Sequence, residues 1–173
     1  LNRAVNLSER LYVKKAMNEA RFVCGVYQVG IITGQPTINF AYPLMNVNKT
    51  PEGVAYAALK LDHFAEMLSV IPLPDGSELA VLDTKGTVLY SRLKDIHKIG
   101  ERFPEETMAS PLATPGDATV TLKDKDGIKR IYSRRSVTGF DDIHVLVGLS
   151  EEEAMAGANS ALVRNFVVIG ILS

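Results

Sequence analysis

The chain has 173 residues, of which 46% are hydrophobic and 23% are charged, and its formal net charge is −1. These values suit a globular protein of one ordinary domain or two small ones. Lysine and arginine are spread along the chain rather than clustered, which argues against a nucleic-acid-binding surface. The single cysteine, Cys24, cannot form an internal disulfide and lies in an apolar run, so we expect a buried, unreactive thiol.

Residues 1–72 are predicted to form an antiparallel sheet with two helices. Residues 1–21 have helical spacing of apolar side chains without glycine or proline, so we expect a helix, broken near Ser8. Strand-like runs follow at 22–29, 37–45 and 54–61, and the short turns between them favour a meander. Asp62 is then expected to cap a helix over residues 63–71.

Alternation of side chains along these strands divides the sheet into two faces. On the second strand one face is apolar (Ile38, Phe40, Tyr42, Leu44) and the other is small or polar (Thr37, Asn39, Ala41, Pro43). On the third strand Val54, Tyr56, Ala58 and Lys60 share a face. The apolar face should meet a core. Two interpretations of the polar face stay open: solvent, or a ligand cavity.

A hairpin is predicted at the start of the second half of the chain. Residues 79–82 and 87–90 are rich in strand-forming side chains, and Asp83-Thr-Lys-Gly86 between them has the signature of a type I turn closed by glycine. The proline-rich loop at 72–76 cannot lie inside a sheet, so a new folding unit should begin near residue 73.

Three more strands are expected at 118–123, 128–137 and 143–149, after a charged, irregular stretch with a short helix at 104–110. Two strands, a helical connection and three strands match an antiparallel PAS-type sheet. A five-stranded barrel is the alternative, but the connection over residues 92–115 is long for a barrel turn. The predicted fold class is therefore α+β.

The C-terminal segment is predicted to be a helix that leads to a membrane. Ser150 followed by three glutamates has the pattern of a capping box, and the helix should run from residue 151 to about 172. Its end, residues 166–172, is uninterrupted apolar sequence after Arg164. Seven residues do not cross a bilayer, so the segment is either docked on the domain or the start of a transmembrane helix, and the basic residue before it favours the second.

Several stretches together resemble the double Cache sensor domains of bacterial transmembrane receptors. Glu9–Ala16 is similar to the Asp-Arg-Pro-Tyr-Phe-x-x-Ala segment of the membrane-distal module, with Leu11 in place of the proline. Further matching stretches are Gly25–Pro36, Phe40–Pro43, Gly53–Leu61 and Val81–Leu89.

The resemblance implies two stacked PAS-like modules, a distal one over residues 1–72 and a proximal one over 73–150, followed by a signalling and membrane-entry helix over 151–173. A complete distal module would have a long N-terminal helix and a first hairpin before Leu1, so either the sequence begins inside the distal module or this protein has an abbreviated one. It further implies an extracytoplasmic, periplasmic location in a bacterial inner-membrane receptor, a homodimer, and a small-molecule ligand held between the distal sheet and a capping segment.

The same resemblance implies a set of ligand-binding residues. Arg10 and Tyr12 match the segment that holds a ligand carboxylate, and Tyr27, Asn39 and Tyr42 lie on matching strands. Tyr56 shares the face of Lys60, which stands where amino-acid-binding members tend to have an aspartate for the ligand ammonium. Because Lys60 would repel an ammonium, Arg10 and Lys60 favour an anion such as a carboxylate. The alternative is a solvent-facing Lys60 beside Asp62.

No catalytic or metal-binding motif is present. The three histidines, His63, His97 and His144, lack metal-ligand spacing, and Asp124-Lys-Asp126-Gly127 is more typical of a turn than of a calcium loop. We therefore expect a sensor without enzymatic activity, cofactor, metal or nucleic-acid partner. Its output domain would be a histidine kinase, diguanylate cyclase or chemotaxis transducer, and the alternative function is a ligand-free dimerisation module.

Overall fold

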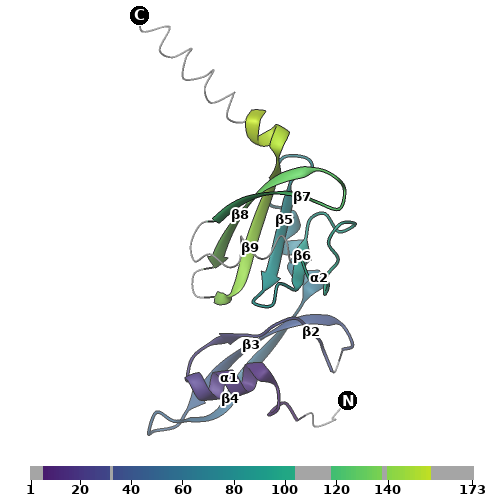
Figure 1. The fold of residues 1–173 in the computed structure, drawn as a ribbon. Coiled ribbons are helices and arrows are strands. Elements are labelled where there is room, and N and C mark those ends of the chain that lie inside the picture. The colour runs from purple at the N-terminus through teal and green to yellow at the C-terminus, as the bar shows by residue number, and fades with distance from the viewer. Residues whose placement is uncertain (1–5, 32, 104–117, 138–139, 157–173) are drawn as a thin grey trace, which may run out of the picture.

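Two antiparallel sheets, one above the other, make up the protein (Figure 1). The computed structural model describes residues 6–31, 33–103, 118–137 and 140–156. We call the part with the first sheet the N-terminal unit and the part with the second sheet the C-terminal unit. The predicted α+β class is confirmed, with helices beside both sheets.

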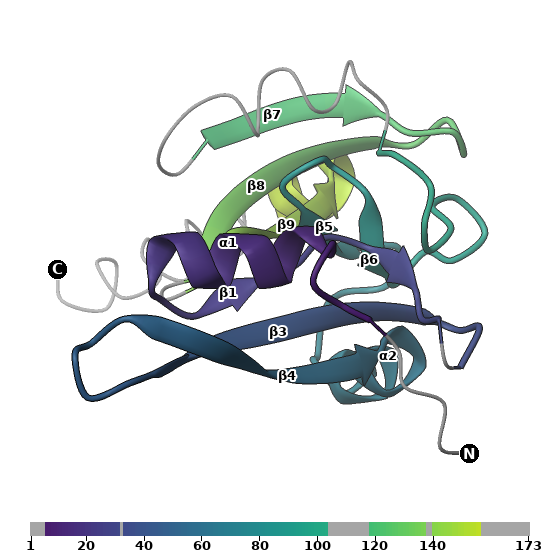
Figure 2. The same cartoon turned by 90° about the horizontal axis from the view of Figure 1, so that it is seen from below.

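The first sheet is built around one long central strand. Its elements are α1 (Leu11–Glu19), β1 (Val23–Cys24), β2 (Gln28–Val29), β3 (Pro36–Met45) and β4 (Pro51–Lys60). β4 pairs with one edge of β3, while β1 and β2 share its other edge, and all pairings are antiparallel. α1 lies along one face of this sheet, where Tyr12 and Ala16 pack against Val23 and Ala41 (Figure 2).

Helix α1 is shorter than predicted. It begins at Leu11 because Arg10 has extended backbone angles, φ −72° and ψ 134°, and the Asn6 side chain accepts a hydrogen bond from the amide of Ser8 in the turn before it. Residues 6–10 are therefore not helical, and residues 1–5 of the expected helix lie outside the described residues. At the other end Ala20 adopts the left-handed conformation, φ 53°, which stops the helix.

The predicted strand over residues 22–29 is wrong as a single strand. It is interrupted between β1 and β2, where the backbone amide of Tyr27 donates to Oδ2 of Asp83 in the C-terminal unit at 2.9 Å. An amide that bonds to a side chain of another unit cannot also join the ladder to β3. The break therefore connects the two units.

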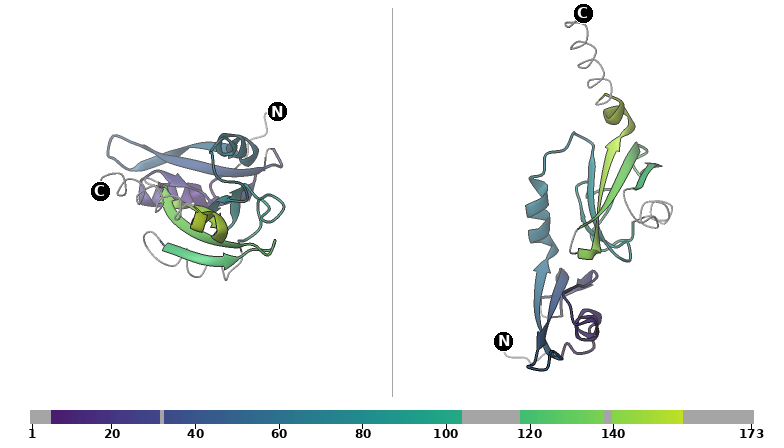
Figure 3. Two further views of the ribbon diagram at one scale, coloured as in Figure 1. Left: turned by 90° about the horizontal axis from the view of Figure 1, so that it is seen from above. Right: turned by 90° about the vertical axis from the view of Figure 1, so that its left-hand side faces the viewer.

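β4 passes directly into helix α2 (Leu61–Ser69), which runs up beside the second sheet (Figure 3, right). Phe64, Ala65 and Leu68 of α2 pack against the core of the C-terminal unit. Asp62 was predicted to cap this helix, but it lies in the first turn. The N-cap position belongs to Lys60, whose side chain makes no capping hydrogen bond.

The second sheet has the strand order β6-β5-β9-β8-β7. Its strands are β5 (Glu78–Asp83), β6 (Val88–Ser91), β7 (Ala118–Lys123), β8 (Lys129–Val137) and β9 (Phe140–Ser150). The sheet is open, with β6 and β7 as its edges, so the barrel alternative is wrong and the PAS-type sheet is confirmed. The short helix expected at 104–110 lies outside the described residues.

The hairpin between β5 and β6 is confirmed, and Asp83 closes it. Oδ1 of Asp83 accepts hydrogen bonds from the amides of Lys85 and Thr87, each at 2.9 Å. Gly86 supplies the positive φ of 74° that the turn needs. The other carboxylate oxygen of the same buried side chain holds Tyr27, so one residue shapes the turn and joins the units.

The hydrophobic core is continuous across the two units. Cys24 and Ile38 of the first sheet belong to the same buried cluster as Leu79, Val81 and Leu89 of the second sheet. A second cluster, around Phe103, Tyr132 and Leu146, fills the other face of the second sheet. β5 is therefore buried on both faces, as its composition requires.

The C-terminal helix begins where predicted. β9 ends at Ser150, whose hydroxyl accepts the amide of Glu153 at 3.1 Å, and residues 151–156 are helical. The expected continuation to residue 172 and the membrane entry lie outside the described residues. Within the described ranges, no helix has the length and apolar character to cross a membrane.

The turn between β7 and β8 carries a buried ion cluster. Arg130, 1% exposed, pairs with Asp124 at 2.6 Å and with Asp126 at 2.8 Å, and it also donates to the carbonyl of Gly76. The two aspartates of this turn are therefore the ion-pair partners of a buried arginine. Burial raises the pKa of Asp124, but the nearby His97 ring and the hydrogen-bond donors Tyr132 and Arg130 outweigh burial, so the pKa lies below its usual value.

We expect Arg130→Met to destabilise the fold by about 3–5 kcal/mol, because it leaves the Asp124 carboxylate buried without its cation. Asp124 has a lowered pKa in the folded state, so its stabilisation is present above about pH 4 and is lost as pH falls through the folded-state pKa. The loss in free energy of unfolding caused by Arg130→Met should therefore be largest at pH 7 and become smaller below pH ~4.

Urea unfolding at several pH values measures this difference. Lys129→Met is the matched control, since it removes an exposed cation from the next position of the same strand. Equal effects of the two substitutions would contradict a stabilising role for the cluster.

Candidate ligand-binding site

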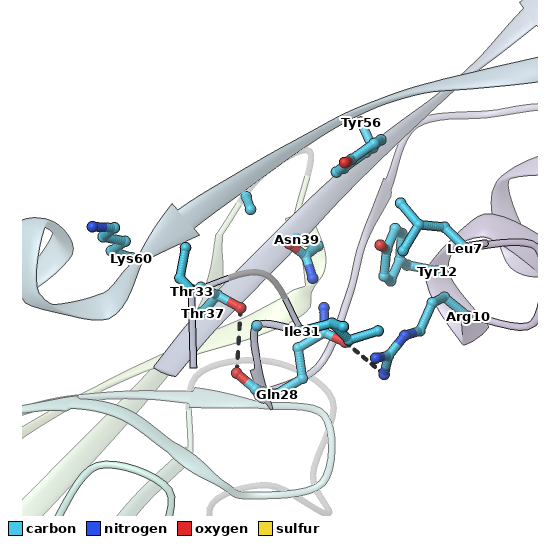
Figure 4. Close-up of a pocket in the computed structure, with 12 residues that line it drawn as sticks. Leu7, Arg10, Tyr12, Gln28, Ile31, Thr33, Thr37, Asn39, Tyr56 and Lys60 are labelled. Atoms are coloured by element: carbon cyan, nitrogen blue, oxygen red, sulfur yellow. Dashed lines mark hydrogen bonds between the residues drawn. The ribbon is translucent and has the colours of Figure 1, made fainter. Parts of the chain in front are cut away.

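A cavity of about 180 Å³ lies on the face of the first sheet that α1 partly covers (Figure 4). Its wall is made from the segment before α1, from α1, from β2 and the turn after it, and from β3 and β4. The lining residues are Leu7, Arg10, Tyr12, Gln28, Gly30, Ile31, Thr33, Thr37, Asn39, Tyr56, Ala58 and Lys60. We call this the N-terminal cavity.

The floor of the cavity follows from strand register. Thr37 pairs with Lys60, Asn39 with Ala58, and Ala41 with Tyr56. Directly paired residues point to the same side of a sheet, so the polar face of β3 and the Tyr56–Lys60 face of β4 form one surface. The β3 part of this face, with Thr37 and Asn39 buried, lines a cavity, whereas Tyr56 of β4 is 48% exposed at its open side.

Asn39 is the most informative residue of the floor. Its side chain is 5% exposed and forms no hydrogen bond with any residue that the structure describes. An amide has two donor hydrogens and an acceptor oxygen, so it can pair with either a donor or an acceptor of a ligand. A residue placed in this way is suited to bind a polar group of a ligand inside the cavity.

Arg10 and Tyr12 form the wall on the α1 side. The Arg10 guanidinium is half-buried and donates to Oε1 of Gln28 at 3.4 Å (Figure 4). Tyr12 is buried, and burial raises the pKa of its hydroxyl, with Tyr56 adding to the rise and Arg10 opposing it. Tyr12 therefore stays a neutral phenol that can donate a hydrogen bond.

Lys60 lies at the opposite end of the cavity from Arg10 (Figure 4). Neither cation has a carboxylate partner in the described part of the chain, and the lining contains no aspartate or glutamate. Half-buried cations without counter-ions give the cavity a positive potential. Chemically, the site can hold an anion but offers no carboxylate for a cation.

Five of the seven predicted site residues line this cavity together: Arg10, Tyr12, Asn39, Tyr56 and Lys60. Tyr42 does not. It points to the opposite face of β3 and is 60% exposed, because strand alternation sets it against Asn39. We correct the prediction for Tyr42 accordingly.

Tyr27 also lies apart from the N-terminal cavity. Its ring packs against the backbone of Gly100, where a Cβ atom would lie 2.7 Å from the Tyr27 hydroxyl, and its amide binds Asp83. Tyr27 is therefore a contact between the units rather than part of the cavity wall.

Sequence reasoning missed several lining residues, including Leu7, Gln28, Ile31 and Thr33. Thr37 and Ala58 were assigned to the correct faces, and pairing the two strands in register would have added them to the site. The turn residues gave no such signal, because their position depends on how the turn folds back over the sheet: Gly34 donates to the carbonyl of Gly30 at 2.8 Å.

A second cavity, of about 360 Å³, lies between α1 and the C-terminal unit. It shares Arg10, Tyr12 and Gln28 with the N-terminal cavity. On its far side the ammonium of Lys15 binds Oδ1 of Asp142 at 2.8 Å. Helix α1 and the residue before it thus contribute to the wall between the cavities and hold one end of an ion pair to β9.

No model of a known protein family matches the sequence, and no curated protein does so either. Solved structures do match. The extracellular domain of a protein described as a histidine kinase, mmHK1S-Z3, superposes with a TM-score of 0.72 at 16% identity, covering 91% of this chain and 59% of that one.

Chemoreceptors match as well. The ligand-binding domain of CtaA from Pseudomonas fluorescens, in complex with L-leucine, has a TM-score of 0.65 at 18% identity, over 90% of this chain and 64% of that one. The ligand-binding domain of PctB from Pseudomonas aeruginosa, in complex with L-Arg, has a TM-score of 0.66 at 17% identity, over 92% of this chain and 62% of that one.

The chain has the fold of these sensor domains. The predicted resemblance to Cache-type, PAS-like sensors is confirmed at the level of fold. The chain spans less than two thirds of the length of the structures it matches, between 59% and 64% for these three. At such low identity the ligands of the neighbours are properties of those proteins alone.

The structure makes a direct prediction for Cys24. Burial raises the pKa of its thiol to about 12, and the carboxylates of Asp142 and Asp83 add to the effect. We expect Ellman's reagent to modify the folded protein roughly a thousandfold more slowly than the same chain in urea, because almost no thiolate exists at neutral pH. Complete modification of the folded protein within minutes would contradict the buried position.

Proposed function

We propose that the chain is the extracytoplasmic small-molecule-sensing domain of a bacterial membrane receptor and has no enzymatic activity of its own. The N-terminal cavity carries this proposal, since it brings the buried, unpartnered Asn39 together with two cations that have no counter-ion. The sensor-domain fold supports it, because the matched structures are extracellular, periplasmic or ligand-binding domains of kinases and chemoreceptors.

The ligand we propose is a carboxylate. Arg10 presents a planar guanidinium at the cavity wall, and Tyr12 adds a neutral phenol beside it. A guanidinium can bind both oxygens of a carboxylate, and such charge-assisted hydrogen bonds are about twice as strong as neutral ones. Gln28, the present partner of Arg10 at 3.4 Å, is a weak competitor for it.

The rest of the receptor is part of the same proposal. The helix that begins after Ser150 would continue as the predicted helix to residue 172 and enter the inner membrane. The cytoplasmic output would then be a histidine kinase, diguanylate cyclase or chemotaxis transducer, and the receptor would act as a homodimer.

We further propose that ligand binding shifts a pre-existing equilibrium between two arrangements of the units. A ligand achieves this only if it binds one arrangement better. The route would start at Arg10 and Tyr12 and pass along α1 to Lys15. The ion pair of Lys15 with Asp142 would carry it to β9, which leads directly to Ser150 and the C-terminal helix.

The second candidate function is a ligand-free dimerisation module. The sheet face remote from the cavity favours it, because Tyr42 and Leu44 are 60% and 52% exposed there. Large apolar side chains gathered on a protein surface are typical of interaction sites. This function predicts self-association without any response to small molecules.

A thermal-shift assay of the 173-residue chain against carboxylates, amino acids, amines and nucleobases tests the primary function. A ligand at 100 times its dissociation constant should stabilise the fold by about 2.7 kcal/mol, which is several degrees. Arg10→Met should weaken carboxylate binding about ten- to a hundredfold, because a charge-assisted contact is lost.

Arg21→Met is the matched control for this substitution. Arg21 is an exposed arginine of the same unit, paired with Glu19 outside the cavity, so its removal should leave the shift unchanged. If Arg10→Met keeps the full ligand-induced rise in melting temperature, the ligand binds elsewhere. If no compound raises the melting temperature of the unmodified chain, the dimerisation module is favoured.

The relay is tested with Lys15→Met, which removes the ion pair between α1 and β9. We expect ligand affinity to stay within about twofold, since Lys15 lines only the second cavity. Ligand-induced slowing of amide hydrogen exchange in β9 should be lost, because its connection to α1 is broken.

Lys14→Met is the control for the relay, since Lys14 pairs with Glu9 inside the N-terminal unit. Undiminished protection of β9 in Lys15→Met would rule out the α1 route. Ligand-dependent output from a full-length receptor without residues 151–172 would exclude the final step.

A further inference from the structure

We propose that the ligand of the N-terminal cavity is a short diacid, with one acidic group bound by Arg10, the other by Lys60, and no ammonium group. This inference rests on the proposed sensing function and specifies the chemistry that the same site recognises.

The placement of the two cations is the first argument. Arg10 precedes α1, whereas Lys60 ends β4, and the two lie at opposite ends of one cavity, with the Lys60 side chain extended away from Arg10 (Figure 4). The four-carbon stem of a lysine is flexible, so the ammonium can turn toward a ligand. Neither has a carboxylate partner among the described residues. A ligand with one acidic group at each end would neutralise both cations, whereas a monoacid would leave one of them unpaired.

The wall between the cations is the second argument. Tyr12 and Leu7 lie on one side of the cavity and Tyr56 lies on the other (Figure 4), and β4 also contributes Ala58 to the lining. These side chains present mainly carbon atoms, so they suit a methylene chain. Asn39 supplies the remaining polar group, which can donate to a carboxylate or accept from a hydroxyl.

The volume sets the length of the ligand. A space of about 180 Å³ suits a small ligand, such as a chain of about four to six carbons with a carboxylate at each end.

The absence of acids from the lining is the third argument. An amino acid brings an ammonium that must lose its water on binding, and among the described lining residues there is no carboxylate to compensate for this loss. At the Lys60 end the ammonium would also meet a like charge. The cavity therefore discriminates against ω-amino acids more strongly than against neutral analogues.

Three four-carbon probes that differ only at one end test the inference: succinate, butyrate and 4-aminobutyrate. Glutarate and adipate, each with its matched monoacid and ω-amino acid, extend the test to longer ligands. Isothermal titration with the 173-residue chain should give an affinity for the best diacid at least about tenfold higher than for its monoacid. The matching ω-amino acid should bind more weakly than the monoacid.

The role of Lys60 is tested by substitution. Lys60→Met should reduce diacid affinity to that of the monoacid and leave the monoacid affinity unchanged, because only the second acidic group loses its partner. Lys60→Asp should reverse the preference, so that the ω-amino acid binds better than the diacid. Lys129→Met, which removes an exposed cation of the C-terminal unit, is the control and should change neither.

The outcomes separate this inference from the function on which it rests. If amino acids or monoacids bind as well as diacids, or if diacid affinity survives Lys60→Met, the diacid proposal is wrong and the sensing function stands. If none of these acids nor any compound of the wider thermal-shift screen binds, both are wrong.

Discussion

The buried carboxylate of Asp83 forms hydrogen bonds in both units at once. One oxygen accepts the amides of Lys85 and Thr87 in the hairpin of the second sheet. The other accepts the amide of Tyr27, which therefore does not pair with β3 in the first sheet. Because the side chain is fully buried, both sets of hydrogen bonds must be kept for the fold to be stable. The turn of one unit and the interrupted edge of the other are therefore held by the same group, next to the core that Ile38 and Val81 share.

The second sheet was largely predictable from sequence, because its strands, turns and caps each carry a local signal. The strand over 118–123 was predicted to the residue, and Gly86 and Ser150 act as their turn and cap chemistry indicates. The errors occur where long-range contacts replace local ones. Tyr27 leaves the ladder for a partner 56 positions away, and nothing in residues 22–29 encodes that choice. Tyr42 was predicted to bind the ligand because it lies in a stretch that resembles the sensor family. Alternation along the strand places it on the face opposite Asn39, where it is 60% exposed.

The candidate site combines a familiar fold with an unusual charge pattern. Asn39, Tyr12 and Arg10 converge because strand register and one helix start set their directions, and these are backbone properties. The charge of the lining depends instead on single side chains such as Lys60, which a different residue could replace without disturbing the sheet. Fold similarity thus carries information about where a ligand lies, whereas side-chain chemistry decides which ligand it is.

The junction at Ser150 has a consequence for the angular position of everything that follows. The same residue ends β9 and caps the helix, so no flexible linker separates sheet from helix. An α-helix turns by about 100° per residue, and the pairing of β9 with β5 fixes the starting angle. Adding or removing a single residue here would rotate the whole downstream helix about its axis. Fusions of this domain to a foreign output should therefore vary in activity with the periodicity of a helix, not with the length of the joint.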